Sequence, residues 1–344
     1  MKVGKWIICL MIVFFAGCYE VGEREAQPST WPAETPLKIN TAPPVDLPAA
    51  KPIVIGFSQL GSESTWRAAN SASIKSAARE AGITLIMKNA EQSQQKQVEA
   101  IRSFMQSKVD IIAIAPVVQT GWDEILEEVK QAGIPVIILD RSVNVKDSSL
   151  YVTFIGSDFF DEGVKAAKYM LDKMRHHVGL INIAELQGTT GSTPSIDRGR
   201  GFRETIKGRD TFQITQTQPA DFTKSGGRKV MREFLSQPKD KWPQVLFSHN
   251  DDMAIGAVEA IEEAGLKPGT DIIIISVDGT RRAFEQMIAG NINAVVECNP
   301  LLGPLLMQAT QEIMSGRTLP KRMVPAEDIF PQELAAMEVA NRTY

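Results

Sequence analysis

Residues 111–141 read IIAIAPVVQTGWDEILEEVKQAGIPVIILDR, and this stretch decides the fold. Residues 111–115 and 135–139 are short, unbroken apolar runs of strand length, while residues 122–132 between them read as a helix that Gly133 ends. Strands that are apolar at every position are typical of parallel sheets with helices packed on both faces. The stretch therefore predicts one strand–helix–strand unit of a parallel α/β sheet.

The same alternation runs outward in both directions and restarts near residue 156. Further apolar runs predict strands at 53–57, 83–87 and 151–155 before that point, and at 178–186, 212–217, 244–248, 272–277 and 294–297 after it. Roughly 290 residues are many for one such sheet, because single hydrophobic cores stop growing near ~250–300 residues. We therefore expect an α/β protein with two doubly wound parallel-sheet lobes.

The first fifty residues predict export from the cytoplasm. A short positive region precedes an uncharged apolar run at residues 6–16, which suits a signal peptide and is shorter than the ~20 residues of a membrane-spanning helix. The sequence Phe15-Ala16-Gly17-Cys18 resembles a bacterial lipobox, although Phe15 stands where Leu is commonest. We expect a lipoprotein signal peptide at residues 1–17 and a lipid on Cys18; secretion without lipidation and an uncleaved anchor are the alternatives.

The linker that follows and the overall composition narrow the classes of function. Residues 18–50 hold six prolines and few large apolar side chains, so they predict a disordered linker outside the fold. Beyond it Cys298 is the single cysteine, which excludes an intramolecular disulfide or a cysteine-based metal cluster there, and the three histidines do not indicate a metal site. With 41 acidic against 37 basic residues, the charge gives no indication of nucleic-acid binding.

Polar and aromatic residues gather just after the predicted strands, which is where open α/β sheets bind ligands. They are Ser58-Gln59 and residues 63–67 after the first strand, Asp140-Arg141 after the fourth, and Asp197-Arg198, Asp221-Phe222, residues 249–252, Asp278 and Cys298-Asn299 in the second half. Sugar hydroxyls donate and accept hydrogen bonds, so they match carboxylates, arginine forks and asparagine amides. The apolar face of a sugar ring packs on an aromatic plane, which Trp66 and Phe222 could provide. This set predicts a carbohydrate site.

Some of these residues also have a purely structural interpretation. The alternatives are an ion pair for Asp140 and Arg141, a core position for Trp66, and helix caps for Asp221, Asp251 or Asp252, in which case Asn250 is the better contact and Phe222 faces the cleft. Each residue alone is therefore weak support for a ligand site, and the support comes from their recurrence at successive strand ends.

Four runs of the chain carry a family resemblance. They are Leu139-Asp140-Arg141, Gln218-Pro-Ala-Asp-Phe222, Asn250-Asp-Asp-Met-Ala-Ile-Gly256 and Val277-Asp-Gly-Thr280. These runs are similar to motifs of the periplasmic sugar-binding proteins of the ribose and galactose type, which are receptors for ABC importers. Residues 56–59, 61–64, 66–67, 115–118, 120–122 and 186–189 also resemble the pattern of the galactofuranose-binding branch.

The resemblance implies a set of ligand contacts and a domain layout. The implied contacts are Glu63, Ser64, Trp66, Arg67, Arg141, Arg198, Asn250 and Asp278, and the strand-end pattern adds Gln59, Asp140 and Phe222. The implied fold is a type I periplasmic binding protein with a three-stranded hinge, an N-terminal lobe of residues 51–155 plus about 299–328, a C-terminal lobe of residues 156–298, and a tail at 329–344. Cys298 departs from the ribose branch, which tends to have Gln there, and Arg281-Arg282 add positive charge near the cleft rim.

These observations favour an extracytoplasmic solute-binding lipoprotein, periplasmic or on the cell surface. It would capture a galactofuranose-like monosaccharide and deliver it to the permease and ATPase of an ABC importer; a sugar-sensing input protein for a histidine kinase or chemoreceptor is the alternative. A repressor is disfavoured because a signal and a linker occupy the place of a DNA-binding domain. An enzyme is disfavoured because nothing requires Glu63 and Asp278 to flank a scissile bond. We expect a monomer without catalytic residues, cofactor or bound metal.

Overall fold

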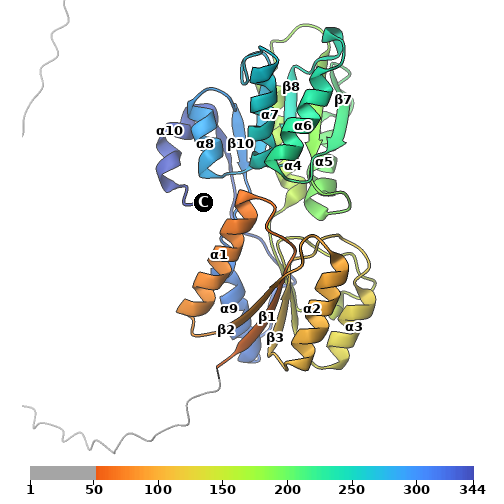
Figure 1. Ribbon diagram of the computed structural model, residues 1–344, viewed down its shortest axis with the longest axis vertical. Coiled ribbons are helices and arrows are strands. Elements are labelled where there is room, and N and C mark those ends of the chain that lie inside the picture. Colours follow the sequence, from red (N-terminus) through yellow and green to blue (C-terminus); the bar gives the residue numbers. More distant parts are fainter. Residues whose placement is uncertain (1–51) are drawn as a thin grey trace, which may run out of the picture. The chain divides into compact units, whose positions relative to one another are not determined.

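The structure is a computed structural model that describes residues 52–344 (Figure 1). The predicted signal peptide at 1–17, the lipidation site Cys18 and the predicted linker at 18–50 lie outside the described residues. Within residues 52–344, no helix combines the length and the hydrophobicity that crossing a membrane requires. This part of the chain contains two six-stranded sheets, each with helices on both faces.

The first sheet has the order β11-β5-β4-β3-β1-β2, and each neighbouring pair is parallel. Its strands are β1 (Val54–Gln59), β2 (Thr84–Asn89), β3 (Ile111–Ile114), β4 (Val136–Leu139), β5 (Thr153–Ile155) and β11 (Arg322–Met323). Helices α1 (Thr65–Glu80) and α9 (Gly303–Met314) cover one face, and α2 (Gln94–Gln106) and α3 (Asp123–Gln131) cover the other. Because side chains alternate along a strand, Ile111 packs under the first helix pair and Ile112 under the second.

The second sheet has the order β12-β10-β9-β8-β6-β7 and is parallel except for its edge pair β10–β12. Its strands are β6 (Ile181–Gln187), β7 (Phe212–Pro219), β8 (Val245–Ser248), β9 (Ile273–Asp278), β10 (Ala294–Glu297) and β12 (Ile329–Pro331). Helices α4 (Phe159–Lys173) and α5 (Thr193–Ile206) cover one face, and α6 (Lys224–Leu235), α7 (Asp251–Glu263), α8 (Arg281–Ile288) and α10 (Ala335–Glu338) cover the other. Phe247 packs under the first group and Leu246 under the second.

Three segments cross between the two lobes, at residues 156–158, 298–302 and 324–328. The second crossing leads into α9, which returns to the first sheet, and the third leads into β12 and the chain's last residues on the second sheet (Figure 1). Short 3₁₀ turns complete the described chain at Ser148–Leu150, Lys239–Lys241, Gln332–Leu334 and Val339–Asn341. The predicted fold class, two doubly wound lobes with a three-stranded hinge, is confirmed.

The local predictions deviate from the structure mainly at the edges. The strand predicted at 178–186 begins at Ile181, because residues 178–180 are exposed. Strands β11 and β12 were not predicted, since two or three residues carry no periodicity, and β12 contains Pro331, which a sheet tolerates at its edge. The tail at 329–344 packs on the second lobe through β12, α10 and the turn at Val339–Asn341.

Candidate ligand-binding cleft

A cavity of about 290 Å³ lies between the lobes, and its walls come from residues that follow strands of both sheets. Its lining consists of Glu63, Ser64, Trp66, Arg67, Asp140, Arg141, Phe159, Pro194, Arg198, Phe222, Asn250, Asp278 and Cys298. Ten of the eleven side chains predicted from the sequence are brought together here.

The first lobe contributes an arginine held between two carboxylates. Ser64 caps α1, and its Oγ accepts a hydrogen bond from the Arg67 backbone N at 3.1 Å, which fixes the first turn. Arg67 Nε lies 3.2 Å from Glu63 Oε1, and Nη2 lies 2.7 Å from Asp140 Oδ2. Asp140 has a φ of +64°, a conformation that non-glycine residues seldom adopt and that is often found at functional sites.

Arg141 is the most desolvated charge of this half. Its Nη1 donates to the Val117 carbonyl at 3.0 Å, and its guanidinium lies 5.3 Å from the ring centre of Phe222 in the other lobe. Burial and the neighbouring Arg67 charge lower its pKa to about 10. Its contacts to Glu63 and Asp140 are long, at 4.0 and 3.9 Å, so the alternative of a self-sufficient Asp140–Arg141 ion pair does not describe the site.

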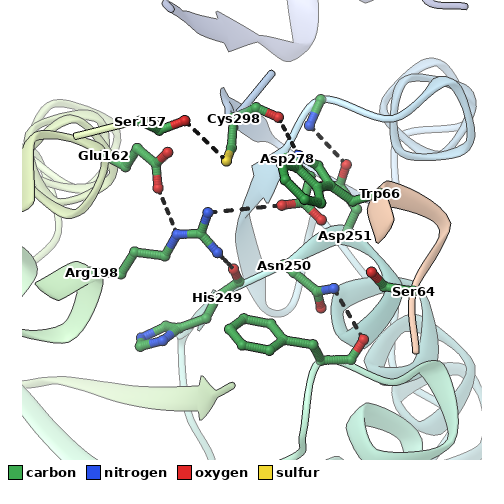
Figure 2. Close-up of polar contacts among 12 residues, drawn as sticks. Ser64, Trp66, Ser157, Glu162, Arg198, His249, Asn250, Asp251, Asp278 and Cys298 are labelled. Carbon is green, nitrogen blue, oxygen red and sulfur yellow. Dashed lines mark hydrogen bonds and ion pairs between the residues drawn. The ribbon is translucent and has the colours of Figure 1, made fainter. Parts of the chain in front are cut away.

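The second lobe is organised around Arg198 from α5. Its Nε donates to Glu162 Oε2 at 2.6 Å, its Nη1 donates to the His249 carbonyl at 2.5 Å, and its Nη2 lies 3.9 Å from Asp278 Oδ1 (Figure 2). Burial opposes the guanidinium charge, but the charge of Glu162 and the hydrogen bond to it outweigh burial and raise the pKa of Arg198 above its usual value. Arg198 is thus a fixed cation whose third nitrogen is directed at Asp278.

Asn250 and Asp278 complete the polar wall. Asn250, not Asp251 or Asp252, is the cap of α7: its Oδ1 accepts from the Met253 backbone N at 2.9 Å, and its Nδ2 donates to the Phe222 carbonyl at 3.1 Å. Asp278 ends β9 with a φ of +131°. Burial and the nearby charge of Asp251 raise its pKa well above the usual value, with Arg198 acting in the opposite direction.

The structure decides between the alternatives that the sequence left for the aromatic residues Trp66 and Phe222. Trp66 is 4% exposed, and its Nε1 donates to the Cys298 carbonyl at 2.6 Å; it packs with apolar residues of the second lobe and also lines the cavity, so both interpretations hold together. Phe222 has a φ of +59° and packs on Gly188, where a Cβ would lie 1.8 Å from the ring. Glycine at 188 therefore lets this ring reach the cavity.

The prediction for Gln59 is wrong in its placement, and three lining residues were missed. Gln59 does not line the cavity: its Nε2 donates to Asn70 Oδ1 and Ser71 Oγ, both at 3.0 Å, which ties β1 to α1. Phe159, Pro194 and Cys298 line the cavity instead. A search for polar residues after strands cannot find the two apolar side chains, which begin helices α4 and α5. Cys298 does belong to the residues that follow a strand, but it is absent from the predicted contacts.

Several buried polar atoms of the lining have no hydrogen-bond partner within residues 52–344. Apart from Asp140 Oδ2, which lies 2.7 Å from Arg67 Nη2, they are Glu63 Oε2, Arg67 Nη1, Arg141 Nε and Asp278 Oδ2. A buried polar atom without a partner is costly, and native proteins seldom retain one without a functional reason. Two of the four are donors and two are acceptors, which matches a ligand rich in hydroxyl groups.

One group of potential metal ligands lies beside the cavity, where Glu162, Cys298 and Glu327 have ligand atoms within 4.8 Å of one another. One oxygen of each carboxylate already has protein partners, while Glu162 Oε1 has none among the described residues: Glu162 Oε2 accepts from Arg198, and Glu327 Oε1 accepts from Ser157 Oγ at 2.6 Å and from the Asn299 backbone N at 2.7 Å. A guanidinium in direct contact with Glu162 repels a cation. This cluster is better suited to joining the hinge segments than to holding a metal.

Direct hydrogen bonds also join the two lobes around the cavity. Asp252 of α7 accepts from the Thr65 backbone N at 2.7 Å and from Thr65 Oγ1 at 3.1 Å. The Ser142 backbone N donates to Thr193 Oγ1 at 3.1 Å, on the Arg141 side of the cavity. The lobes are therefore closed over the lining residues.

Comparison with known proteins places this architecture in a family. Residues 55–318 match the family described as a periplasmic binding protein domain. The chain is 43% identical over 275 residues to the galactofuranose-binding protein YtfQ of Escherichia coli K12, covering 80% of this chain and 86% of that protein. Two solved structures are similar. One is a Mycobacterium smegmatis protein in complex with β-D-fucofuranose, with 48% identity, coverage of 85% of this chain and 95% of that one, and a TM-score of 0.82. The other is the binding protein of the Shewanella sp. ANA-3 arabinose ABC transporter bound to L-arabinofuranose, with 45% identity, coverage of 84% of this chain and 95% of that one, and a TM-score of 0.81.

Proposed function

This chain belongs to the periplasmic binding protein family, and from that premise we propose that it captures a neutral furanose sugar between its lobes and delivers it to an ABC importer. The observation that carries the proposal is the group of unpartnered buried polar atoms on Glu63, Arg67, Arg141 and Asp278. A monosaccharide ring carries several hydroxyls on a compact frame, so one molecule can satisfy donors and acceptors on opposite walls at once.

The charges of the lining favour a ligand without charge. Three arginines, Arg67, Arg141 and Arg198, are matched by three carboxylates that accept from or lie beside them, Glu63, Asp140 and Glu162. An anionic or cationic ligand would add an unpaired charge to a closed, dehydrated cavity, which is costly. A neutral sugar adds hydroxyl hydrogen bonds to groups that are already charge-balanced, and hydrogen bonds to charged groups are stronger than those between neutral groups.

The relatives support the choice of ring form. Galactofuranose, β-D-fucofuranose and L-arabinofuranose, which the three similar proteins are named for or were crystallised with, are all five-membered rings. Trp66, Phe159 and Phe222 line the cavity and offer apolar surfaces for the C–H face of such a ring.

Delivery follows from closure of the lobes. The hinge segments let the lobes open and close about the sugar, and the Thr65–Asp252 bonds form only when they are closed. A permease that recognises the closed form would then receive loaded protein. We further propose that the protein is a monomer tethered by a lipid on Cys18, and that import, not sensing, is its role.

Binding is tested by calorimetry on the mature protein with D-galactose, D-fucose and L-arabinose, and with galacturonate and galactosamine as charged analogues. We expect affinity near ~1 µM for a neutral sugar and none for the charged analogues. The ring form is identified from the anomeric carbon signal of bound ¹³C-labelled sugar. Binding of a pyranose, or of galacturonate in preference to galactose, would contradict the proposal.

The site itself is tested with Arg141→Ala, which should weaken binding ~100-fold or more while leaving the fold intact, because it removes a buried charged donor. Arg282→Ala is the matched control, since it removes the same charge from an exposed position outside the lining. Equal affinities for the two variants would refute the site. Loss of sugar uptake on gene deletion separates import from sensing, in which uptake would persist, and partition of full-length protein into a detergent phase tests the lipid.

A further inference from the structure

The β9–α8 turn at Asp278-Gly279-Thr280 lies against the last residues of the described chain, far from it in sequence. Asp278 is the cavity carboxylate whose φ of +131° is unfavourable for any residue with a side chain. A strained conformation of this kind persists only where its surroundings hold it from several sides. Other parts of the second lobe contact the turn on two sides.

The inner side of the turn is held by Asp251 of α7. Asp251 Oδ2 accepts from the backbone N of Gly279 at 3.0 Å and of Thr280 at 2.8 Å, and also from Thr280 Oγ1 at 2.9 Å. Its other oxygen accepts from Ser276 Oγ at 2.6 Å. These bonds fix the turn relative to the start of α7, but they leave its outer surface without support.

The outer side of the turn is covered by the tail, at Arg342 and Tyr344. The Arg281 backbone N donates to the Tyr344 carbonyl at 2.6 Å. The Tyr344 hydroxyl and Arg342 Nη1 lie 3.5 and 3.6 Å from the point where a side chain on Gly279 would begin. Gly279 has a φ of +94°, so the position requires glycine for its backbone, and the tail packs over its bare face.

Arg342 is itself rigidly placed, which lets it transmit a constraint. It is 7% exposed, and its guanidinium lies 4.7 Å from the ring centre of Phe284 and 4.3 Å from that of Phe330. Its Nη1 donates to Glu297 Oε1 at 2.5 Å, and Glu297 is the direct strand partner of Asp278 in the β9–β10 pairing. Arg342 thus contacts both the turn and the strand residue beside the cavity carboxylate.

We propose that the tail residues Arg342 and Tyr344 are positioning residues for Asp278: together with Asp251 they clamp the Asp278-Gly279-Thr280 turn and hold the carboxylate in the cavity. The tail is then part of the binding site without touching ligand. This inference rests on the proposed sugar-binding function only for its effect on affinity; the clamp itself concerns the unliganded protein.

Arg342→Ala tests the clamp, with Met337→Ala as the matched control, because Met337 lies in the same tail and is 66% exposed. Hydrogen exchange of the peptide spanning residues 276–284 is measured without sugar, alongside the strand at 111–115 in the first lobe. We expect Arg342→Ala to accelerate exchange at 276–284 alone and to weaken sugar binding about tenfold, and Met337→Ala to do neither. Arg342→Lys, which keeps the charge but not the planar stacking, should fall between them.

The outcomes are distinguishable. Unchanged exchange at 276–284 in Arg342→Ala refutes the clamp, and accelerated exchange in both lobes shows general destabilisation and refutes it too. Accelerated exchange with unchanged affinity refutes the positioning of Asp278. In an Asp278→Asn background the affinity loss from Arg342→Ala should shrink, and an equal loss would mean that Arg342 acts elsewhere. If the unaltered protein binds no sugar, the proposed function fails, while the exchange comparison still decides the clamp.

Discussion

Replacing Asp252 with alanine should weaken ligand binding without altering the cavity, because this side chain joins the lobes and is absent from the lining. Asp252 is 7% exposed, and its two oxygens accept from the backbone N and the hydroxyl of Thr65 at 2.7 and 3.1 Å. In the open form both partners are hydrated, so only the net gain counts, about 1.5–3 kcal/mol for a hydrogen bond to a charged group. A loss of about 2 kcal/mol corresponds to roughly 30-fold weaker affinity.

Binding kinetics can show whether the lost affinity of Asp252→Ala comes from closure of the lobes. The encounter of sugar with an open cleft does not involve the Asp252–Thr65 bonds, so the association rate should stay nearly constant while the dissociation rate rises by most of the 30-fold. Stopped-flow tryptophan fluorescence of the mature protein measures the two rates, and calorimetry measures the affinity. Thr65→Ala removes only the 3.1 Å hydroxyl bond and should show a smaller increase in the same rate.

A matched control on the same helix is Glu262→Ala, which removes an exposed carboxylate at the far end of α7. It should leave both rates unchanged. The closure mechanism is refuted if Asp252→Ala binds as tightly as the unaltered protein, or if the loss lies in association alone.

Two further predictions concern residues behind the cavity. Gly188→Ala should weaken sugar binding about tenfold with the fold retained, because the Cβ of the alanine forces the Phe222 ring towards the cavity. Overpacking of this kind costs about 1–3 kcal/mol. An affinity that calorimetry finds unchanged would count against this packing. Glu185 is buried, which raises its pKa, but its hydrogen bonds, first that to His249, outweigh burial and lower the pKa to about 2. The contribution of this carboxylate to the free energy of unfolding, about 3 kcal/mol, is therefore present above its unfolded pKa and is lost as pH falls from about 4.5 towards 2. Denaturant unfolding of Glu185→Gln should lack this acid-dependent loss. Parallel pH profiles for the variant and the unaltered protein would disprove the prediction.

The sequence was most informative where a single physical signal dominates. Strands such as Ile111–Ile114 are buried on both faces, so every residue is apolar and the strand is visible without its partners. The charged site residues were visible for a related reason: Asp140-Arg141 directly after a buried strand has no role in the core. Asn250 and Asp251 show the limit, because a cap and a turn-holding carboxylate look alike in sequence, and only the partners Met253 and Gly279 distinguish them.

The sequence did not predict contacts that depend on the direction in which a side chain points or on a partner far away in the chain. Gln59 ends a strand, and whether its amide meets ligand or helix depends on Asn70 and Ser71 across the β1–α1 loop. The tail carries too few apolar residues to reveal its docking site. The role of Arg342 depends on its contacts with Phe284 and Glu297, which are far from it in sequence. The pairing of β10 with β12 brings them close to it.

The distribution of ion pairs in the cleft explains how closure can depend on a sugar. Arg67 pairs with Glu63 and Asp140 within the first lobe, and Arg198 pairs with Glu162 within the second and lies near Asp278 there. None of the ion pairs among lining residues joins one lobe to the other, so each half keeps its charges organised when the cleft opens, and closure exchanges no strong charge pair.

The direct bonds between lobes are few hydrogen bonds, such as those of Asp252, that replace bonds to water. We expect such bonds to leave the equilibrium between the open and closed forms close to balanced. A ligand whose hydroxyls reach the unpartnered atoms of both halves then adds its differential binding energy directly to the closed state, which is the condition for a ligand to shift such an equilibrium.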